Sequence, residues 1–168
     1  MESAEENLMA WLRDAHAMET QAVQMLEGQA QRLESYPELR AKVQDHLQET
    51  RRQAEMVEQC IDRRGGRTSG LKEAAAGFTG NMQAMSGIFM SDEVMKGSIA
   101  SYTFEHFEIA NYKALIAAAE QVGDQQTRGT CEQILRQEEA MASWLSQHLP
   151  QVTRQYLERA ETGGPAKR

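Results

Sequence analysis

Apolar side chains recur at every third or fourth position through most of this chain, with polar residues between them. This spacing places the apolar residues on one face of an α-helix, whereas a half-buried strand would show strict alternation. The pattern predicts four long helices, at about 4–33, 36–62, 91–122 and 125–149. Only three prolines interrupt the sequence. The predicted fold class is therefore all-α.

Local signals mark several of the helix ends. Ser3 and Glu6 have the spacing of a capping box, and Ser35 with Glu38 repeats it before the second helix. Asp124 is expected to cap the start of the fourth helix. These signals divide the helices into two hairpins, one turning near Ser35 and the other just before Asp124.

Two segments fall outside the four-helix pattern. The connection between the second and third helices includes a weakly helical piece at about 71–88, and its length suits a crossover between parallel helices. Pro150 is expected to end the fourth helix before a short helix at 151–160. We therefore predict a four-helix bundle domain at 1–162 with a long crossover and a short C-terminal helix, followed by a flexible tail at 163–168.

Four glutamates lie inside the apolar stripes of the predicted helices: Glu19, Glu49, Glu105 and Glu138. Glu19 and Glu49 are equally far from the first hairpin turn, and Glu105 and Glu138 are equally far from the second. In an antiparallel helix pair such residues lie side by side, to within about one turn or 5 Å. The four carboxylates are therefore expected to lie at matching levels of the bundle.

A carboxylate inside an apolar stripe is costly to bury unless it is protonated, paired or bound to a cation. Two divalent cations would neutralise four converging glutamates, and paired metals can hold peroxide or dioxygen between them. The pattern thus indicates a di-iron or di-manganese centre. A chance alignment is the alternative, because the chain contains 25 acidic residues.

The chain lacks the Glu-x-x-His pairs of ferritin-like di-iron proteins. Arg52 stands three residues after Glu49, and Met141 stands three residues after Glu138. This departure is the strongest argument against a ferritin-type metal site, and with the extra C-terminal segment it also argues against iron storage in a ferritin cage.

Two histidines lie close to the glutamates by a different spacing. His46 precedes Glu49 by three residues, and His106 follows Glu105 directly. Each is a candidate metal ligand or a hydrogen-bond partner of one. Imidazole ligands would move the preference toward iron, whereas carboxylates and amides alone favour harder cations such as manganese.

Two runs of sequence, HLQETRRQ at 46–53 and EHFEIANY at 105–112, precede the pair Glu138-Glu139 in this order along the chain. Together they resemble the YciE/YciF family of bacterial ferritin-like stress proteins. The resemblance extends over about 8–149 and is spread over four predicted helices rather than one short motif.

The resemblance implies a ferritin-like bundle that forms a homodimer and takes part in a stress response. It implies that the four aligned glutamates are metal ligands, with Glu108 and Gln53 as additional ligand candidates. His46 and His106 match family positions at which a histidine is structural or supports a ligand.

Composition narrows the choice of partners. The 168 residues carry a formal net charge of -7 with a pI near 5.2, which argues against a general nucleic-acid-binding surface. The arginine-rich run at 63–67 is interpreted as a solvated turn. No apolar run approaches the roughly 18 residues that span a bilayer, and the acidic start at 1–3 lacks the features of a signal peptide. We expect no membrane partner and a cytoplasmic location.

Two functions remain open after the sequence is considered. The first is a non-haem di-iron or di-manganese oxidoreductase, similar to a catalase or peroxidase, that acts on peroxide or dioxygen in stress defence. The second is a metal-free stress bundle that acts by dimerisation or by binding a partner. The first predicts bound metal, whereas the second predicts a folded protein whose stability is unaffected by chelators.

Overall fold

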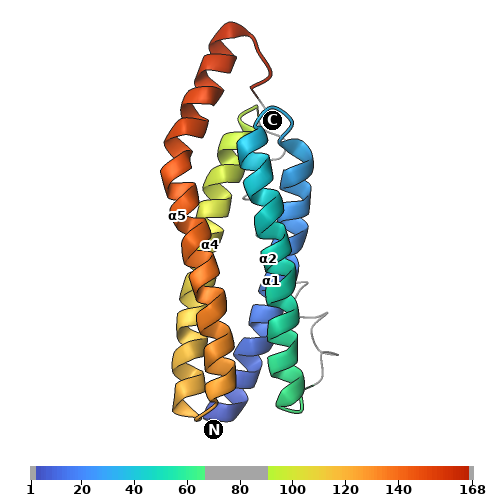
Figure 1. Ribbon diagram of the computed structural model, residues 1–168, viewed down its shortest axis with the longest axis vertical. Helices are drawn as coiled ribbons and strands as arrows, with labels where there is room; N and C mark the ends of the chain where they lie inside the picture. Colours follow the sequence, from blue (N-terminus) through green and yellow to red (C-terminus); the bar gives the residue numbers. More distant parts are fainter. Residues whose placement is uncertain (1–2, 67–90, 167–168) are drawn as a thin grey trace.

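The computed structural model describes residues 3–66 and 91–166. These residues form four long helices (Figure 1), α1 (Ala4–Arg32), α2 (Pro37–Arg63), α4 (Glu93–Gln121) and α5 (Gln125–Thr162). The described residues contain no strand, so the all-α class is confirmed.

The four helices form two antiparallel hairpins, α1 with α2 and α4 with α5 (Figure 1). Helices α2 and α4 run parallel, because α4 begins near the end of α1 whereas α2 ends near the α4–α5 turn. Val94 accordingly packs in one apolar cluster with Leu33, and Arg64 pairs with Asp124. Residues 66 and 91 therefore lie at opposite ends of the bundle, as a long crossover requires. The helical piece expected at 71–88 lies outside the described residues.

Two of the predicted helix caps are present. At the start of α1, the Glu6 backbone N–H donates to Ser3 Oγ at 3.2 Å and the Ser3 N–H donates to Glu6 Oε2 at 2.7 Å. At the start of α5, the Thr127 backbone N–H donates to Asp124 Oδ1 at 2.9 Å. Both local predictions are confirmed, because a capping side chain needs only neighbouring backbone groups to act.

The prediction of a second capping box at Ser35 and Glu38 is wrong. Helix α2 begins at Pro37, and Tyr36 precedes it without a side-chain cap. The reason lies in tertiary packing, since the Tyr36 ring is 2% exposed and its hydroxyl donates to the Ala166 carbonyl at 2.7 Å. The buried ring sets the chain direction at this turn in place of a serine cap.

The helix break predicted at Pro150 is also wrong, because α5 continues through it and absorbs the separate short helix expected at 151–160. Proline in a helix interior costs about 3 kcal/mol, through one lost hydrogen bond and a steric clash. Contacts beyond it offset that cost. Val152 is buried in an apolar cluster, and the Arg159 guanidinium lies 4.4 Å from the centre of the Tyr36 ring.

Two apolar clusters fill the interior, one toward each end of the bundle. The cluster near the N-terminus of α1 and the end of α2 includes Leu8, Leu12, Val57, Ile61 and Ile134. The cluster near the α1–α2 turn includes Leu26, Tyr36, Leu39, Met141 and Leu145. A layer of buried polar residues lies between the two.

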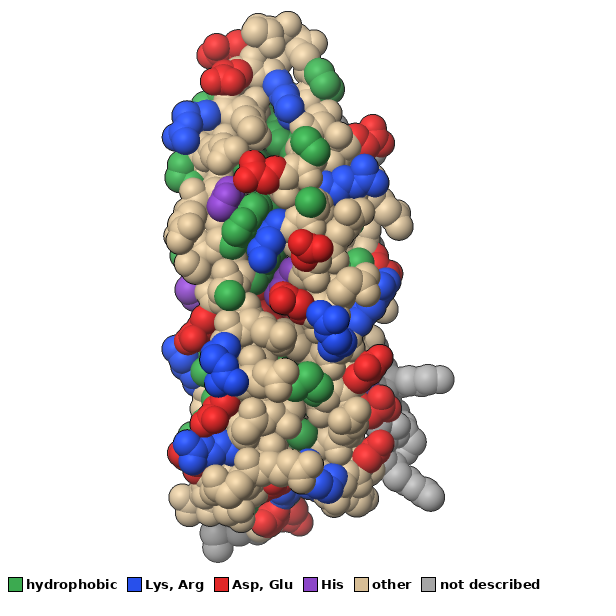
Figure 2. Space-filling view, viewed as in Figure 1, with side chains coloured by type: hydrophobic (Ala, Val, Ile, Leu, Met, Phe, Trp, Pro, Cys, Tyr) green, Lys and Arg blue, Asp and Glu red, His purple; other side chains and the backbone are tan. Residues whose placement is uncertain are grey.

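The outer surface carries mixed charge. Figure 2 shows Lys and Arg side chains interspersed with Asp and Glu side chains on one face, without a large area of one sign. The arginine-rich turn differs from the solvated turn expected, because Arg64 is only 13% exposed and pairs with Asp124 and Glu5. Among the described residues, no helix is long and apolar enough to cross a membrane. The cytoplasmic location stays a prediction.

Candidate metal centre

Each of the four helices sends acidic or imidazole side chains into the polar layer at the middle of the bundle. The contributors are Glu19 from α1, His46 from α2, Glu105 and Glu108 from α4, and Glu138 from α5. Every one of these side chains is at most 1% exposed. Glu105 and Glu108 face the same way because residues three apart share a helix face.

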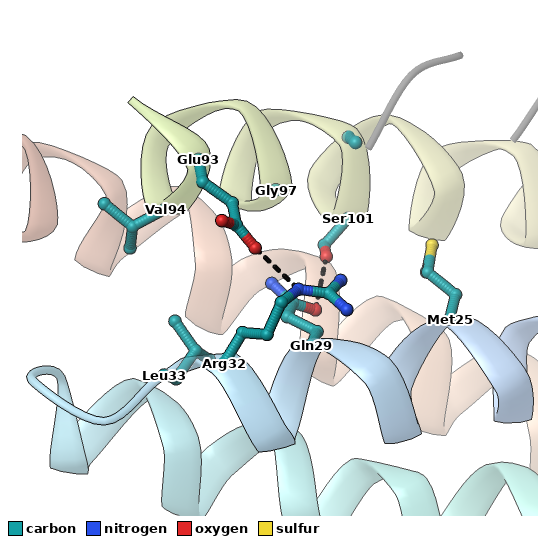
Figure 3. Close-up of a pocket in the computed structure, with 9 residues that line it drawn as sticks. Met25, Gln29, Arg32, Leu33, Glu93, Val94, Gly97 and Ser101 are labelled. Carbon is teal, nitrogen blue, oxygen red and sulfur yellow. Dashed lines mark hydrogen bonds and ion pairs between the residues drawn. The ribbon is translucent and has the colours of Figure 1, made fainter. Parts of the chain in front are cut away.

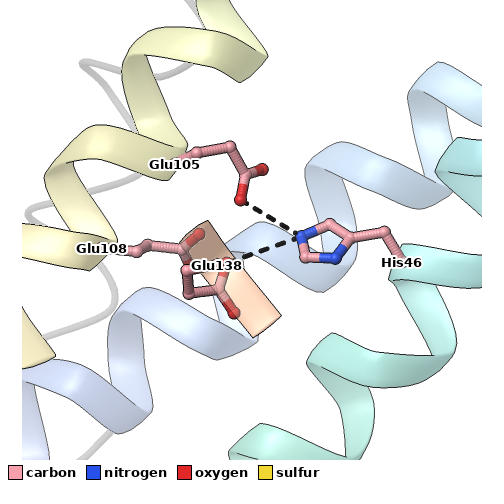
Figure 4. Close-up of side chains that lie close together, drawn as sticks. All are labelled: His46, Glu105, Glu108 and Glu138. Atoms are coloured by element: carbon pink, nitrogen blue, oxygen red, sulfur yellow. Dashed lines mark ion pairs between the residues drawn. The ribbon is translucent and has the colours of Figure 1, made fainter. Parts of the chain in front are cut away.

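Four of these residues point at one another (Figure 4). His46, Glu105, Glu108 and Glu138 each offer one ligand atom, and these atoms all lie within 4.8 Å of one another. The Nε2 atom of His46 lies 3.4 Å from Glu105 Oε2 and 3.6 Å from Glu138 Oε2. The imidazole therefore faces two carboxylates from the opposite hairpin.

Glu19 joins the same layer from α1 through a tyrosine. The Tyr112 hydroxyl, completely buried, donates a hydrogen bond to Glu19 Oε1. The other oxygen of Glu19 is buried and has no hydrogen-bond partner. Tyr112 thus fixes one carboxylate oxygen and leaves its neighbour available.

Burial makes the negative charge of these carboxylates unfavourable. It raises the pKa of Glu108 and Glu138 well above the usual range, and repulsion from neighbouring carboxylates adds to the effect. Burial also raises the pKa of Glu19 to about 8, although the Tyr112 hydrogen bond opposes the shift. These groups are expected to hold protons unless a cation replaces them.

His46 is the positive partner that the layer provides. Burial lowers the pKa of its imidazole, but the carboxylates of Glu105 and Glu49 outweigh this effect and raise it to about 10. Its Nδ1 lies 3.1 Å from Glu49 Oε2. One imidazolium cannot balance four ionised carboxylates, which is why the other carboxyl groups favour the protonated form unless a cation binds.

The donor set fits a divalent cation. Glu19 Oε2 and Glu108 Oε1 are buried without a hydrogen-bond partner, and Glu105 Oε2 and Glu138 Oε2 share one facing atom, His46 Nε2, at 3.4 and 3.6 Å. Such unpartnered groups cost about 1–3 kcal/mol each. Oxygen ligands around a small divalent cation lie about 2.1 Å from it and hence up to about 4.2 Å apart, close to the spacing seen here. Carboxylates with one imidazole suit manganese or iron.

The remaining candidates from α2 lie around this group. Glu49 is not among its members: its side chain is 33% exposed and contacts the group only through His46. Gln53 is completely buried, and its Nε2 donates to Glu138 Oε1 and, at 3.1 Å, to Gln137 Oε1. In this arrangement Gln53 supports a carboxylate of the cluster.

His106 lies away from the central layer. It is exposed on the outer face of α4, where its ring meets the edge of Tyr102 with 4.8 Å between ring centres. His106 directly follows Glu105, and adjacent residues of a helix point about 100° apart. With Glu105 facing the layer, His106 therefore faces outward.

A second interior feature lies near the end of α1 (Figure 3). A cavity of about 30 Å³ is lined by Gln29, Arg32, Glu93 and Ser101 among others. The Ser101 hydroxyl donates to Gln29 Oε1 at 3.0 Å, and Arg32 Nε lies 2.6 Å from Glu93 Oε1. This volume suits about one water molecule, so the cavity is too small for an organic substrate.

These features define a class of protein: a four-helix bundle of ferritin-like topology with a buried carboxylate and histidine cluster at its centre. The chain belongs to the family described as domain of unknown function DUF892, whose profile matches residues 3–158. The resemblance to the YciE/YciF family is thereby confirmed.

Solved structures of bacterial proteins share the fold. A Xanthomonas campestris protein is 38% identical, with a TM-score of 0.80 over 95% of this chain and 99% of that chain. The Escherichia coli stress protein YciF is 20% identical, with a TM-score of 0.73 over 89% and 96% of the two chains. YcfI of Rhodopseudomonas palustris, described as a proposed structural protein, is 24% identical, with a TM-score of 0.71 over 86% and 94%. The last two likenesses concern the fold alone.

Proposed function

We propose that this protein binds iron or manganese in the central layer of its bundle and acts on peroxide or dioxygen in a stress response. One observation carries the proposal: four glutamates, two of them with an unpartnered oxygen, and one histidine are buried together where a core would otherwise be apolar. Structural carboxylates are normally paired, whereas metal ligands need free lone pairs.

Charge balance supports two ions rather than one. With His46 neutral, the carboxylates of Glu19, Glu105, Glu108 and Glu138 carry four negative charges, which two divalent cations would neutralise. His46, Glu105, Glu108 and Glu138 would hold one ion between them, and the free oxygen of Glu19 would extend the site toward a second. Bound iron or manganese would supply redox chemistry toward peroxide or dioxygen.

The surrounding residues have definite roles in this proposal. Glu49 accepts the Nδ1 hydrogen of His46, which leaves Nε2 directed at the carboxylates. A carboxylate on the second ring nitrogen is the usual support of a metal-binding histidine. Gln53 holds Glu138, and Tyr112 holds Glu19, so the ligand set is largely pre-arranged. Binding would release the protons that burial now favours.

Metal content tests the proposal directly. Protein purified without a polyhistidine tag and reconstituted anaerobically should hold about two irons or manganeses per chain by mass spectrometry. Glu138→Ala should lose most of this metal, whereas Glu139→Ala, the adjacent exposed glutamate, should retain it. Loaded protein should then consume peroxide faster than the Glu138→Ala variant. Wild-type protein that stays free of metal after reconstitution would contradict the proposal.

A metal-free stress bundle is the second candidate function. Its support is that raised carboxyl pKa values and a charged His46 can hold the layer together without a metal. The Rhodopseudomonas relative proposed to be structural and the E. coli stress protein are compatible with it. Unchanged unfolding in the presence of a chelator, after metal has been offered, would favour this candidate.

The homodimer implied by the family resemblance is part of the proposal. Two large apolar side chains are well exposed, Trp11 on α1 at 45% and Ile99 on α4 at 48%. Both would be covered in such a dimer. Light scattering across a dilution series would measure the mass directly.

A further inference from the structure

The buried cluster raises the question of how a hydrated cation reaches it. All of its members are at most 1% exposed, and apolar clusters close both ends of the bundle. Ions must therefore pass between two helices. A polar wall would lower the cost of that passage, because a cation loses less solvation where oxygen atoms line its path.

Glu49 connects the solvent with the cluster through His46. Its side chain is one-third exposed, and its Oε2 lies 3.1 Å from His46 Nδ1. On the far side of the same ring, Nε2 lies 3.4 Å from Glu105 Oε2 and faces the cluster (Figure 4). Only the width of one imidazole separates a surface carboxylate from the buried ones.

A second polar connection lies beside the first. Gln53 follows Glu49 by four residues on α2, and its amide joins Gln137 and Glu138 of α5. Gln137 is partly exposed, while Gln53 is completely buried and its Oε1 has no hydrogen-bond partner. An unpartnered carbonyl oxygen at this point is a ready ligand for a passing cation. Gln53 places this connection in the seam between α2 and α5, and Glu49 lies one turn earlier on the same face of α2.

The opposite side of α5 is less suited to cations. A groove of about 390 Å³ runs between α4 and α5, and its lining includes Lys113, paired with Glu139 at 3.6 Å. Lysine repels a cation, and the buried apolar residues Ile109 and Ala142 also line this groove.

We propose that divalent cations reach the central cluster through the seam between α2 and α5, with Glu49 as the surface carboxylate that first binds them and the unpartnered oxygen of Gln53 as a ligand on the way. The inference rests on the proposed function, since it assigns the route by which that site is filled.

The test measures rates as well as amounts. Cobalt(II) is mixed with metal-free protein in a stopped-flow instrument, the absorbance of the bound ion gives the loading rate, and a chelator jump gives the release rate. Glu49→Gln should load about tenfold more slowly, because it removes the attracting charge but keeps an oxygen for His46. Glu139→Gln, an exposed carboxylate in the other groove, should load at the wild-type rate.

Each other outcome overturns the inference in a distinct way. Glu49→Gln that loads at the wild-type rate but releases faster would mean that Glu49 only orients His46. Slower loading in Glu139→Gln would place the route in the α4–α5 groove. Wild-type protein that binds no cobalt, manganese or iron at equilibrium would overturn the proposed function together with the inference, whereas normal metal content with unchanged rates would overturn the inference alone.

Discussion

Two groups of buried or partly buried charge in this protein follow opposite electrostatic rules. At the α4–α5 turn, Asp124 receives hydrogen bonds from Thr127 and pairs with Arg64 at 2.6 Å and Arg63 at 3.2 Å. In the central layer, four glutamates face a single histidine. Asp124 therefore has two positive partners of its own, whereas the four central glutamates share one.

The pKa values record this difference. At the turn, burial opposes the charge of Asp124, but hydrogen bonds from Thr127 and the Arg64 guanidinium hold its pKa well below the usual range. In the central layer, burial raises the pKa of Glu108 and Glu138. The turn favours the charged form of its carboxylate, whereas the central layer disfavours the charged form of its carboxylates, a perturbation that is common at functional sites.

The largest changes in metal affinity and stability are expected when one carboxylate of the central layer is neutralised. In Glu108→Gln, affinity for manganese should fall by at least about 100-fold because a charged ligand is lost. Metal-free protein at pH 8 should become more stable by about 1–2 kcal/mol, since an amide does not have to take up a proton when it is buried, as the Glu108 carboxyl group does. Titration calorimetry and urea unfolding with chelator would measure both. Lower stability with unchanged affinity would assign Glu108 a structural role.

The pH dependence of the metal-free protein is the next largest effect. The pKa of Glu19 is about 8 in the folded protein against 4.5 as a reference, and that of His46 is about 10 against 6.5. The folded state thus binds more protons than the unfolded state between these values. Stability should fall as pH rises from about 5 to about 10, by up to about 1.4 kcal/mol per pH unit for each group that is titrating.

Urea unfolding at a series of pH values, with and without manganese, would measure this effect. Bound metal should flatten the decline, because it replaces the protons. Metal-free protein whose stability rises over this range would show that the carboxylates stay charged in the fold.

Removing the charge of Asp124 at the α4–α5 turn should lower stability, which is the opposite of the change expected for Glu108→Gln. Asp124→Ala should destabilise the protein by about 2–3 kcal/mol, through a lost helix cap and the loss of its ion pairs with Arg63 and Arg64. Metal content should not change, because the turn lies at the end of the bundle. Since the pKa of Asp124 is lowered, its contribution is present above about pH 4 and is lost as pH falls further. A stability change in Asp124→Ala that persists undiminished at pH 2 would contradict this assignment.

The smallest effect is expected at the tyrosine behind Glu19. Tyr112→Phe removes one buried hydrogen bond and should cost about 1 kcal/mol of stability. Manganese affinity should fall a few-fold, because Glu19 loses the donor that fixes one of its oxygens. Tyr102→Phe, on the outer face near His106, serves as the matched control. Equal effects of the two substitutions on affinity would exclude a special role for Tyr112.

The sequence by itself determined the helical class, the two hairpins, the caps at Ser3 and Asp124 and the need for a crossover. These features depend on residue spacing or on groups a few positions apart, so a linear pattern contains them. It also determined the heights of the glutamates, because height along a helix follows from counting residues. Glu19, Glu105 and Glu138 do lie in one buried layer.

Only the tertiary structure decided which side chains point into that layer. The rotation of α2 about its axis places His46 inside and leaves Glu49 a third exposed, although both lie near the same height. Packing also allows α5 to continue through Pro150. At the start of α2, the buried Tyr36 takes the cap position that the sequence assigned to Ser35. The physical reason is that rotation and continuity of a helix depend on contacts between residues far apart in the chain, such as Tyr36 with Arg159.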